Sequence, residues 1–269
     1  MQWNKGLLIV ALLVVSGCQT NKDAKEEIAK LNEELESAQS SMYDIPDVID
    51  YDKAAKINAE LGLSYLQQGQ NARAKTKLLR AMKLAPDMPD VHYAYGYYLE
   101  HIGELVEAEK SYLLAIKHDP KNGKSYNNYG AFLCRMARYR ESETQFMQAL
   151  KDKDYARTGE VYENAGVCVM QIPDIAKAQT YFETALRHDP NRHYAMLELA
   201  IIKYRQNNIL EAQNYYSTYT KLAAPTKRSL LLGVKLAEYT GNKDQAASLK
   251  LLLQAKFPDA KTKDLFISG

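Results

Sequence analysis

Small and apolar residues recur along this chain with a period of about 34, and polar residues fill the spaces between them. Four of the five steps between the small residues are 34 long, and the one after position 130 is 36. Within each period the apolar residues follow a spacing of three and four, which is typical of helices with one buried side. The small positions are Gly62, Gly96, Gly130, Gly166, Ala200 and Val234.

The first period shows how this pattern predicts structure. Gly62 and Tyr65 share one side of a first helix, and Ala74 and Leu78 share one side of a second. Small residues let the two helices approach closely. Pro86 ends the second helix because proline cannot donate the next backbone hydrogen bond. Six such periods predict about twelve helices in residues 53–260.

A 34-residue period of two helices resembles the tetratricopeptide repeat. The resemblance implies an all-α fold, a right-handed superhelix of six tetratricopeptide repeats in which each repeat packs on its neighbours. The longer step falls at residues 151–155, where a polar turn replaces the proline that closes other repeats. This turn is a tolerated insertion, a hinge or a contact for a partner.

The chain begins with a segment that we expect to be removed. Lys5 precedes an apolar run at residues 6–15, which is too short to span a bilayer. The residues up to Cys18 resemble a bacterial lipobox, so residues 1–17 are expected to be a lipoprotein signal peptide and Cys18 the lipidation site. The alternative is an ordinary signal peptide with a chance cysteine. Gln19 follows in place of the aspartate that retains many lipoproteins at the inner membrane, which predicts the periplasmic face of the outer membrane.

A charged linker at residues 18–52 and a short tail at residues 261–269 flank the repeats. The pattern of residues 25–37 in the linker predicts a short amphipathic helix, which is a charged spacer or a segment for self-association. The whole chain is 46% hydrophobic and 25% charged, with a formal net charge of +2. This balance gives no electrostatic argument for nucleic acid, which needs a basic face, so no nucleic-acid partner is expected.

No motif in the sequence indicates an enzyme. His118 and His188 each precede Asp-Pro at the end of a repeat, where turn formation explains the pattern. The histidines have no metal-ligand spacing, and no phosphate-binding loop or nucleophile elbow is present. We therefore expect no catalytic residues, no metal, no small-molecule substrate and no cofactor except the covalent lipid on Cys18.

Two cysteines lie on the first helices of neighbouring repeats. Cys134 and Cys168 belong to the third and fourth repeats, and thiols that are close together tend to pair in an oxidising compartment. A disulfide between them would join the two repeats across the long turn. The alternative is two buried, small apolar residues.

The repeat resemblance also implies a concave groove lined by the first helix of each repeat. The side chains at its groove positions are rich in aromatic, aliphatic and amide groups, which interfaces favour. This predicts a groove for a peptide or a helix, and the alternative is a tightly curved scaffold. The candidate groove residues are Leu63, Leu66, Tyr93, Tyr97, Asn127, Asn128, Tyr194 and Tyr204.

Three segments, at residues 61–69, 127–133 and 228–237, resemble more than a generic repeat. Together with the lipobox and the six repeats, they resemble the type IV pilus biogenesis and stability lipoproteins PilF and PilW. The resemblance runs from Cys18 to about Pro258 and departs from the family in the linker helix.

The resemblance implies a pilotin, an outer-membrane lipoprotein that escorts the pilus secretin subunit and promotes its multimerisation. The expected contact is the N-terminal half of the groove, with Asn127 and Asn128 pairing with the backbone of the client. The alternative is a lipid-anchored adaptor for cell-wall hydrolases or for outer-membrane barrel assembly.

Overall fold

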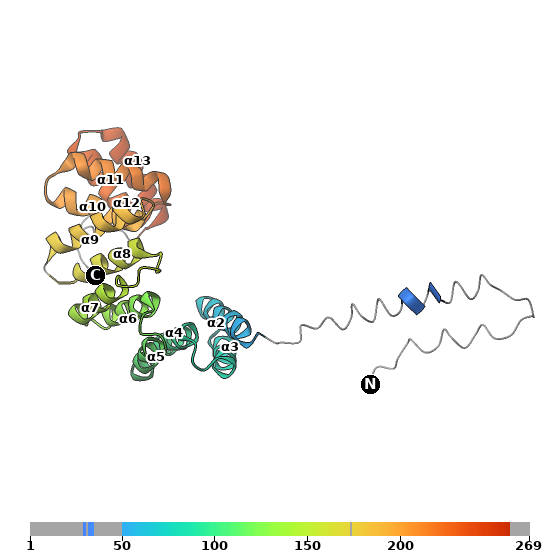
Figure 1. The fold of residues 1–269 in the computed structure, drawn as a ribbon. Helices are drawn as coiled ribbons and strands as arrows, with labels where there is room; N and C mark the ends of the chain where they lie inside the picture. The colour runs from blue at the N-terminus through green and yellow to red at the C-terminus, as the bar shows by residue number, and fades with distance from the viewer. Residues whose placement is uncertain (1–28, 31, 35–49, 173, 259–269) are drawn as a thin grey trace, which may run out of the picture. The chain divides into compact units, whose positions relative to one another are not determined.

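Helices packed in chain order make up the described residues from Tyr51 onward (Figure 1). The computed structural model describes residues 29–30, 32–34, 50–172 and 174–258. Twelve helices are found in the described residues from 51 onward. They are α2 (Tyr51–Gln67), α3 (Asn71–Leu84), α4 (Pro89–His101), α5 (Leu105–His118), α6 (Gly123–Arg135), α7 (Tyr139–Ala149), α8 (Thr158–Val169), α9 (Ile175–His188), α10 (His193–Arg205), α11 (Ile209–Leu222), α12 (Lys227–Tyr239) and α13 (Lys243–Lys256).

These helices form six pairs, each an even-numbered helix followed by an odd-numbered one. Each pair packs together closely, and every pair also contacts the next pair along the chain. The all-α superhelix of six repeats predicted from the sequence is therefore confirmed. We call the first helix of each repeat an A helix (α2, α4, α6, α8, α10 and α12) and the second a B helix.

Close approach of the two helices in a repeat depends on the small residues that set the period. A Cβ atom added at Gly130 would lie 2.8 Å from the ring of Phe146, and one at Gly166 would lie 2.7 Å from the ring of Phe182. Real side chains do not pack that closely, so these positions need glycine. In the last repeat, Gly233 allows a close approach from the preceding repeat, because a Cβ there would overlap the hydroxyl of Tyr216 on α11.

Local signals in the sequence explain where the helices begin. Pro89 occupies the first position of α4, where its missing N–H costs nothing. Asn122 accepts a hydrogen bond from the backbone N–H of Ser125 at 3.0 Å and caps α6. Thr226 and Ser229 form a reciprocal capping box at the start of α12. These caps satisfy backbone donors that have no partner within the helix.

The long turn between the third and fourth repeats is packed against the third repeat. The carboxylate of Asp152 accepts a hydrogen bond at 2.8 Å from the backbone N–H of Gly123, the first residue of α6. A Cβ at Gly123 would lie 2.7 Å from the carbonyl oxygen of Ala149. The turn thus closes over the N-terminus of α6, which favours an insertion fixed by specific contacts over a hinge.

The predicted signal peptide, the lipidation site Cys18 and the C-terminal tail lie outside the described residues. Of the linker, residues 29–30 and 32–34 are helical, within the short helix that the sequence predicts. In the part of the chain that the structure describes, no helix combines the length and apolar character needed to cross a bilayer.

Candidate partner-binding surface

Three of the predicted groove residues, all aromatic or aliphatic, lie on the first two A helices and are partly exposed. Tyr93 and Tyr97 lie one turn apart on α4, with ring centroids 6.4 Å apart. Leu63 on α2 and both tyrosines are half-buried and pack against the core of the first three repeats. We call Leu63, Tyr93 and Tyr97 the tyrosine surface. Burial raises the pKa of Tyr93, and the neighbouring Tyr97 raises it further, so this hydroxyl stays neutral.

A half-buried carboxylate joins α4 to the next A helix, α6. Glu100 on α4 binds the guanidinium of Arg135 on α6 through both oxygens, and one of these contacts is 2.8 Å long. Tyr112 donates a hydrogen bond of 2.8 Å to the same carboxylate. Burial raises the pKa of Tyr112 and the charge of Glu100 raises it further, so Tyr112 remains a donor. These contacts fix the orientation of α6 relative to α4.

Two of the predicted groove residues are not available to a partner. Leu66 is 3% exposed and belongs to the core. Asn127 is 2% exposed, and its amide nitrogen lies 3.4 Å from the hydroxyl of Tyr155 and 3.3 Å from the carboxylate of Glu160. Its amide oxygen accepts a hydrogen bond from Asn164 at 3.1 Å. Asn127 therefore ties α6 to α8 and to the long turn.

Asn128 differs from its neighbour Asn127. It is half-buried, and its side-chain nitrogen is buried without a hydrogen-bond partner in the described residues. A buried amide without a partner is uncommon, because leaving a donor unpaired costs about 1–3 kcal/mol. Of the two asparagines, Asn128 is the one with unused hydrogen-bonding capacity.

Two further ion pairs join A helices in the second half of the stack. Glu163 on α8 is 8% exposed and accepts hydrogen bonds from Arg192, at 2.5 Å, and from the backbone N–H of Ala195, at 3.0 Å. Glu198 on α10 is fully buried and binds Arg228 on α12, with one contact at 3.0 Å. Neither pair was predicted from the sequence. The available signal was a glutamate followed by an arginine about 30 residues later.

The last two predicted groove residues lie apart from the tyrosine surface, on α10. Tyr194 is 40% exposed, and burial of the rest of its side chain raises its pKa to about 12. Tyr204, near the end of α10, lines a hollow of about 350 Å³ together with Arg205, Asn207, Ile209 and Tyr239. The predicted residues thus fall into an N-terminal group and a C-terminal group.

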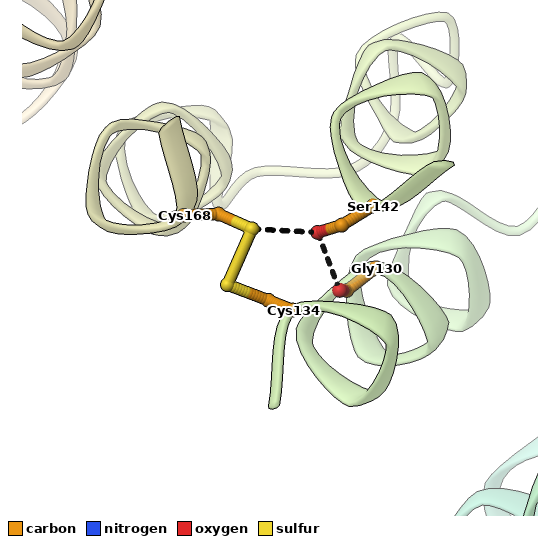
Figure 2. The surroundings of a disulfide bond; sticks show 4 residues. All are labelled: Gly130, Cys134, Ser142 and Cys168. Atoms are coloured by element: carbon orange, nitrogen blue, oxygen red, sulfur yellow. Dashed lines mark hydrogen bonds between the residues drawn. A yellow bond between two sulfur atoms is a disulfide. The ribbon is translucent and has the colours of Figure 1, made fainter. Parts of the chain in front are cut away.

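A disulfide joins the third and fourth repeats at the level of their A helices (Figure 2). Cys134 on α6 and Cys168 on α8 are 34 residues apart in sequence, and their Cα atoms are 5.6 Å apart. Such a distance is normal for a disulfide. Ser142, on the intervening α7, donates a hydrogen bond of 2.7 Å to the carbonyl of Gly130, and its oxygen lies 3.2 Å from the sulfur of Cys168.

The histidines at the repeat ends have structural contacts. The ring of His118 stacks on His92 with centroids 4.9 Å apart, and His188 stacks on Tyr162 at 5.6 Å. The aspartates that follow these two histidines accept hydrogen bonds from backbone N–H groups two residues later. Turn formation therefore accounts for both His-Asp pairs. Among the described residues, no group of three or more His, Cys, Asp or Glu side chains is placed to hold a metal ion.

Comparison with known proteins identifies the repeat and the family. A family model described as a tetratricopeptide repeat matches residues 59–123 and 171–226, and a second model with the same description matches residues 111–144. Over 207 residues the chain is 34% identical to the type IV pilus assembly protein PilF of Pseudomonas aeruginosa, an alignment that covers 77% of this chain and 82% of that protein. The chain belongs to the PilF family.

Solved structures of PilF-family proteins agree with this assignment. The structure of Pseudomonas aeruginosa PilF superposes with a TM-score of 0.73 at 32% identity, covering 81% of this chain and 98% of that one. PilW, a widely conserved type IV pilus biogenesis factor, superposes with a TM-score of 0.66 at 27% identity, covering 77% of this chain and 96% of its own. The chain is thus a PilF-like repeat protein of type IV pilus biogenesis.

Proposed function

We propose that this PilF-family protein is an outer-membrane pilotin. Anchored through a lipid on Cys18, it binds the type IV pilus secretin subunit and promotes the outer-membrane localisation and multimerisation of the secretin. The observation that carries the proposal is the similarity to PilF over 207 residues, which spans most of the repeat array. The lipobox-like sequence ending at Cys18 supports the anchor. The proposed role of the protein is to hold a client, and this role includes no catalytic step.

The tyrosine surface is the proposed contact for the secretin. Its three side chains are partly exposed but held in place by the core of repeats 1 to 3, so little side-chain entropy is lost when a partner binds. Fully burying an aromatic or aliphatic side chain contributes about 1.5–3 kcal/mol. Completing the burial of three such side chains is compatible with binding in the micromolar range. Asn128 lies on the next A helix, but its amide nitrogen is buried, so the proposed contact depends on the three side chains of the tyrosine surface.

Secretin multimers that resist heat and detergent provide the test. An immunoblot of outer membranes would compare a deletion strain with strains carrying the wild type or Cys18→Ala. We expect multimers to disappear on deletion and to return only with the wild type. Unchanged multimers in the deletion strain would refute the pilotin assignment and favour an adaptor for cell-wall hydrolases or barrel assembly.

Substitutions on the tyrosine surface locate the contact. Tyr93→Ala combined with Tyr97→Ala should abolish multimers, whereas Tyr239→Ala, at a tyrosine that is 58% exposed on the last A helix, should not. Circular dichroism melts must show that the double variant remains folded, because Tyr93 also packs on Tyr112 with ring centroids 6.3 Å apart. A folded double variant that supports normal multimers would place the secretin contact elsewhere.

A further inference from the structure

The B helix of the first repeat, α3, carries an unusual charge. Its 14 residues include five basic side chains and no acidic one, a formal charge of +5. The other five B helices have formal charges between −1 and +2, and the whole chain has only +2. Positive charge is therefore concentrated on one helix. The five residues are Arg73, Lys75, Lys77, Arg80 and Lys83.

These charges face solvent. Lys75, Arg80 and Lys83 are exposed, while Leu78 on the opposite side of α3 is fully buried. Leu79 is 46% exposed and lies four residues from Lys75 on one side and from Lys83 on the other. Because residues four apart are neighbours on a helix surface, an apolar tip stands between two ammonium groups. Among the ion pairs of the described residues, none involves a side chain of α3.

A hollow at the edge of the same helix collects groups that bind phosphate. It has a volume of about 370 Å³ and is lined by Tyr65, Ala72, Arg73, Thr76 and Lys77. The guanidinium of Arg73 lies over the ring of Tyr65, 5.8 Å from its centroid. Arginine and lysine are the side chains that recognise phosphate oxygens, and arginine does so with paired donors.

We propose that α3 docks on the anionic headgroups of the membrane that carries the lipid anchor. This inference rests on the anchoring part of the proposed function. Residues 19–50 separate Cys18 from α2, and a chain of that length spans at most roughly 110 Å when fully extended. A lipid on Cys18 therefore does not by itself hold the repeats against the bilayer. Each basic side chain near an anionic surface adds about 1 kcal/mol, or roughly fivefold in binding.

A bilayer fits α3 better than an acidic protein does. Leu79 gives α3 an exposed apolar tip that can enter the headgroup region, while the basic side chains around it contact the anionic headgroups. The proposed client contact is on the A helices α2 and α4, whereas α3 is a B helix. Docking through α3 thus uses a helix that the secretin contact does not need.

A fluorescent label on α3 in the lipidated full-length protein tests the proposal. Leu79→Cys would carry a polarity-sensitive dye, and the matched control is Leu113→Cys on α5, which occupies the same repeat position, is 45% exposed and lies on a helix with no net charge. The native cysteines do not compete, because Cys134 and Cys168 are bridged and Cys18 is acylated. The vesicles contain nitroxide-labelled lipid in phosphatidylcholine, with or without an equal part of phosphatidylglycerol.

We expect the dye at Leu79 to be quenched more than the dye at Leu113. This difference should appear only with vesicles that contain phosphatidylglycerol, and only at low salt. Lys75→Gln, Arg80→Gln and Lys83→Gln together should lower the ratio of docked to undocked protein roughly a hundredfold. Lys221→Gln, Lys243→Gln and Lys256→Gln remove the same charge from the last two repeats and should have no effect.

Equal quenching at the two positions, quenching without anionic lipid, or quenching that survives the α3 substitutions would each overturn the proposal. If the α3 substitutions leave quenching unchanged but abolish secretin multimers, α3 binds the client protein and not the lipid. Flotation of the protein with neutral vesicles at high salt reports on the anchor alone. A failure there contradicts the anchoring part of the proposed function and is distinguishable from a failure of α3 to dock.

Discussion

The disulfide between the third and fourth repeats should be a main source of stability in the stack. The perturbation is Cys134→Ala with Cys168→Ala, or reduction of the wild type. In the chain-entropy model a bridge across 34 residues stabilises the folded state by about 4 kcal/mol, because it restricts the unfolded chain. With a urea dependence of about 2 kcal/mol per molar, this moves the unfolding midpoint down by about 2 M.

The assay is urea unfolding followed by circular dichroism, with and without reductant. The double alanine variant is the control, since reductant should not change its midpoint. Thiol labelling of the native protein should find no free thiol before reduction and two afterwards. The reasoning fails if the native, unreduced protein has two free thiols, or if wild type and variant unfold at the same urea concentration with the bridge intact.

Two other features give separate predictions. Arg228→Met should destabilise the protein by about 3–5 kcal/mol, because it leaves the fully buried carboxylate of Glu198 without a cation. Adding Glu198→Leu should recover most of this loss in urea unfolding, and a mild effect of the single variant would contradict the argument. Burial and the nearby His118 lower the pKa of His92 in the folded protein. As the pH falls, the unfolded chain, with a histidine pKa of about 6.5, is therefore protonated at this residue before the folded protein is. Stability is therefore lost as the pH falls below about 6.5. His92→Tyr keeps an aromatic ring to stack on His118, as Tyr162 stacks on His188. The melting temperature of this variant should fall less than that of the wild type between neutral and mildly acidic pH. An equal fall in the two proteins would refute this role of His92.

Periodicity predicted the helices well because each repeat buries the same positions. The spacing of small residues located the close approaches at Gly130 and Gly166, and the structure confirms both. The last repeat has a further close contact outside the count, at Gly233. A Cβ there would lie 3.1 Å from Leu249 of the same repeat and would overlap Tyr216 of the preceding repeat. The period of one repeat cannot anticipate such a contact between repeats.

The candidate groove was harder to predict, because groove positions were assigned from the repeat alone. Asn127 has the spacing of a groove residue, but the two-residue insertion brings Tyr155 within 3.4 Å of its amide and covers it. Leu66 lies on the same helix as Leu63 but turns into the core. The ion pair between Glu198 and Arg228 depends on contacts between repeats that the sequence of one repeat does not contain.

The position of the bridge also has a mechanical consequence. The two cysteines lie in the third and fourth of six repeats, so a pulling force between the two ends of the chain passes through the sulfur atoms. All of α7 and most of α8 lie inside the bridged loop and carry no tension. Fully stretched, the bridged chain is roughly 110 Å shorter than the reduced chain. Any load applied across the two ends of the repeat stack would therefore leave α7 and most of α8 unstretched for as long as the bridge is intact.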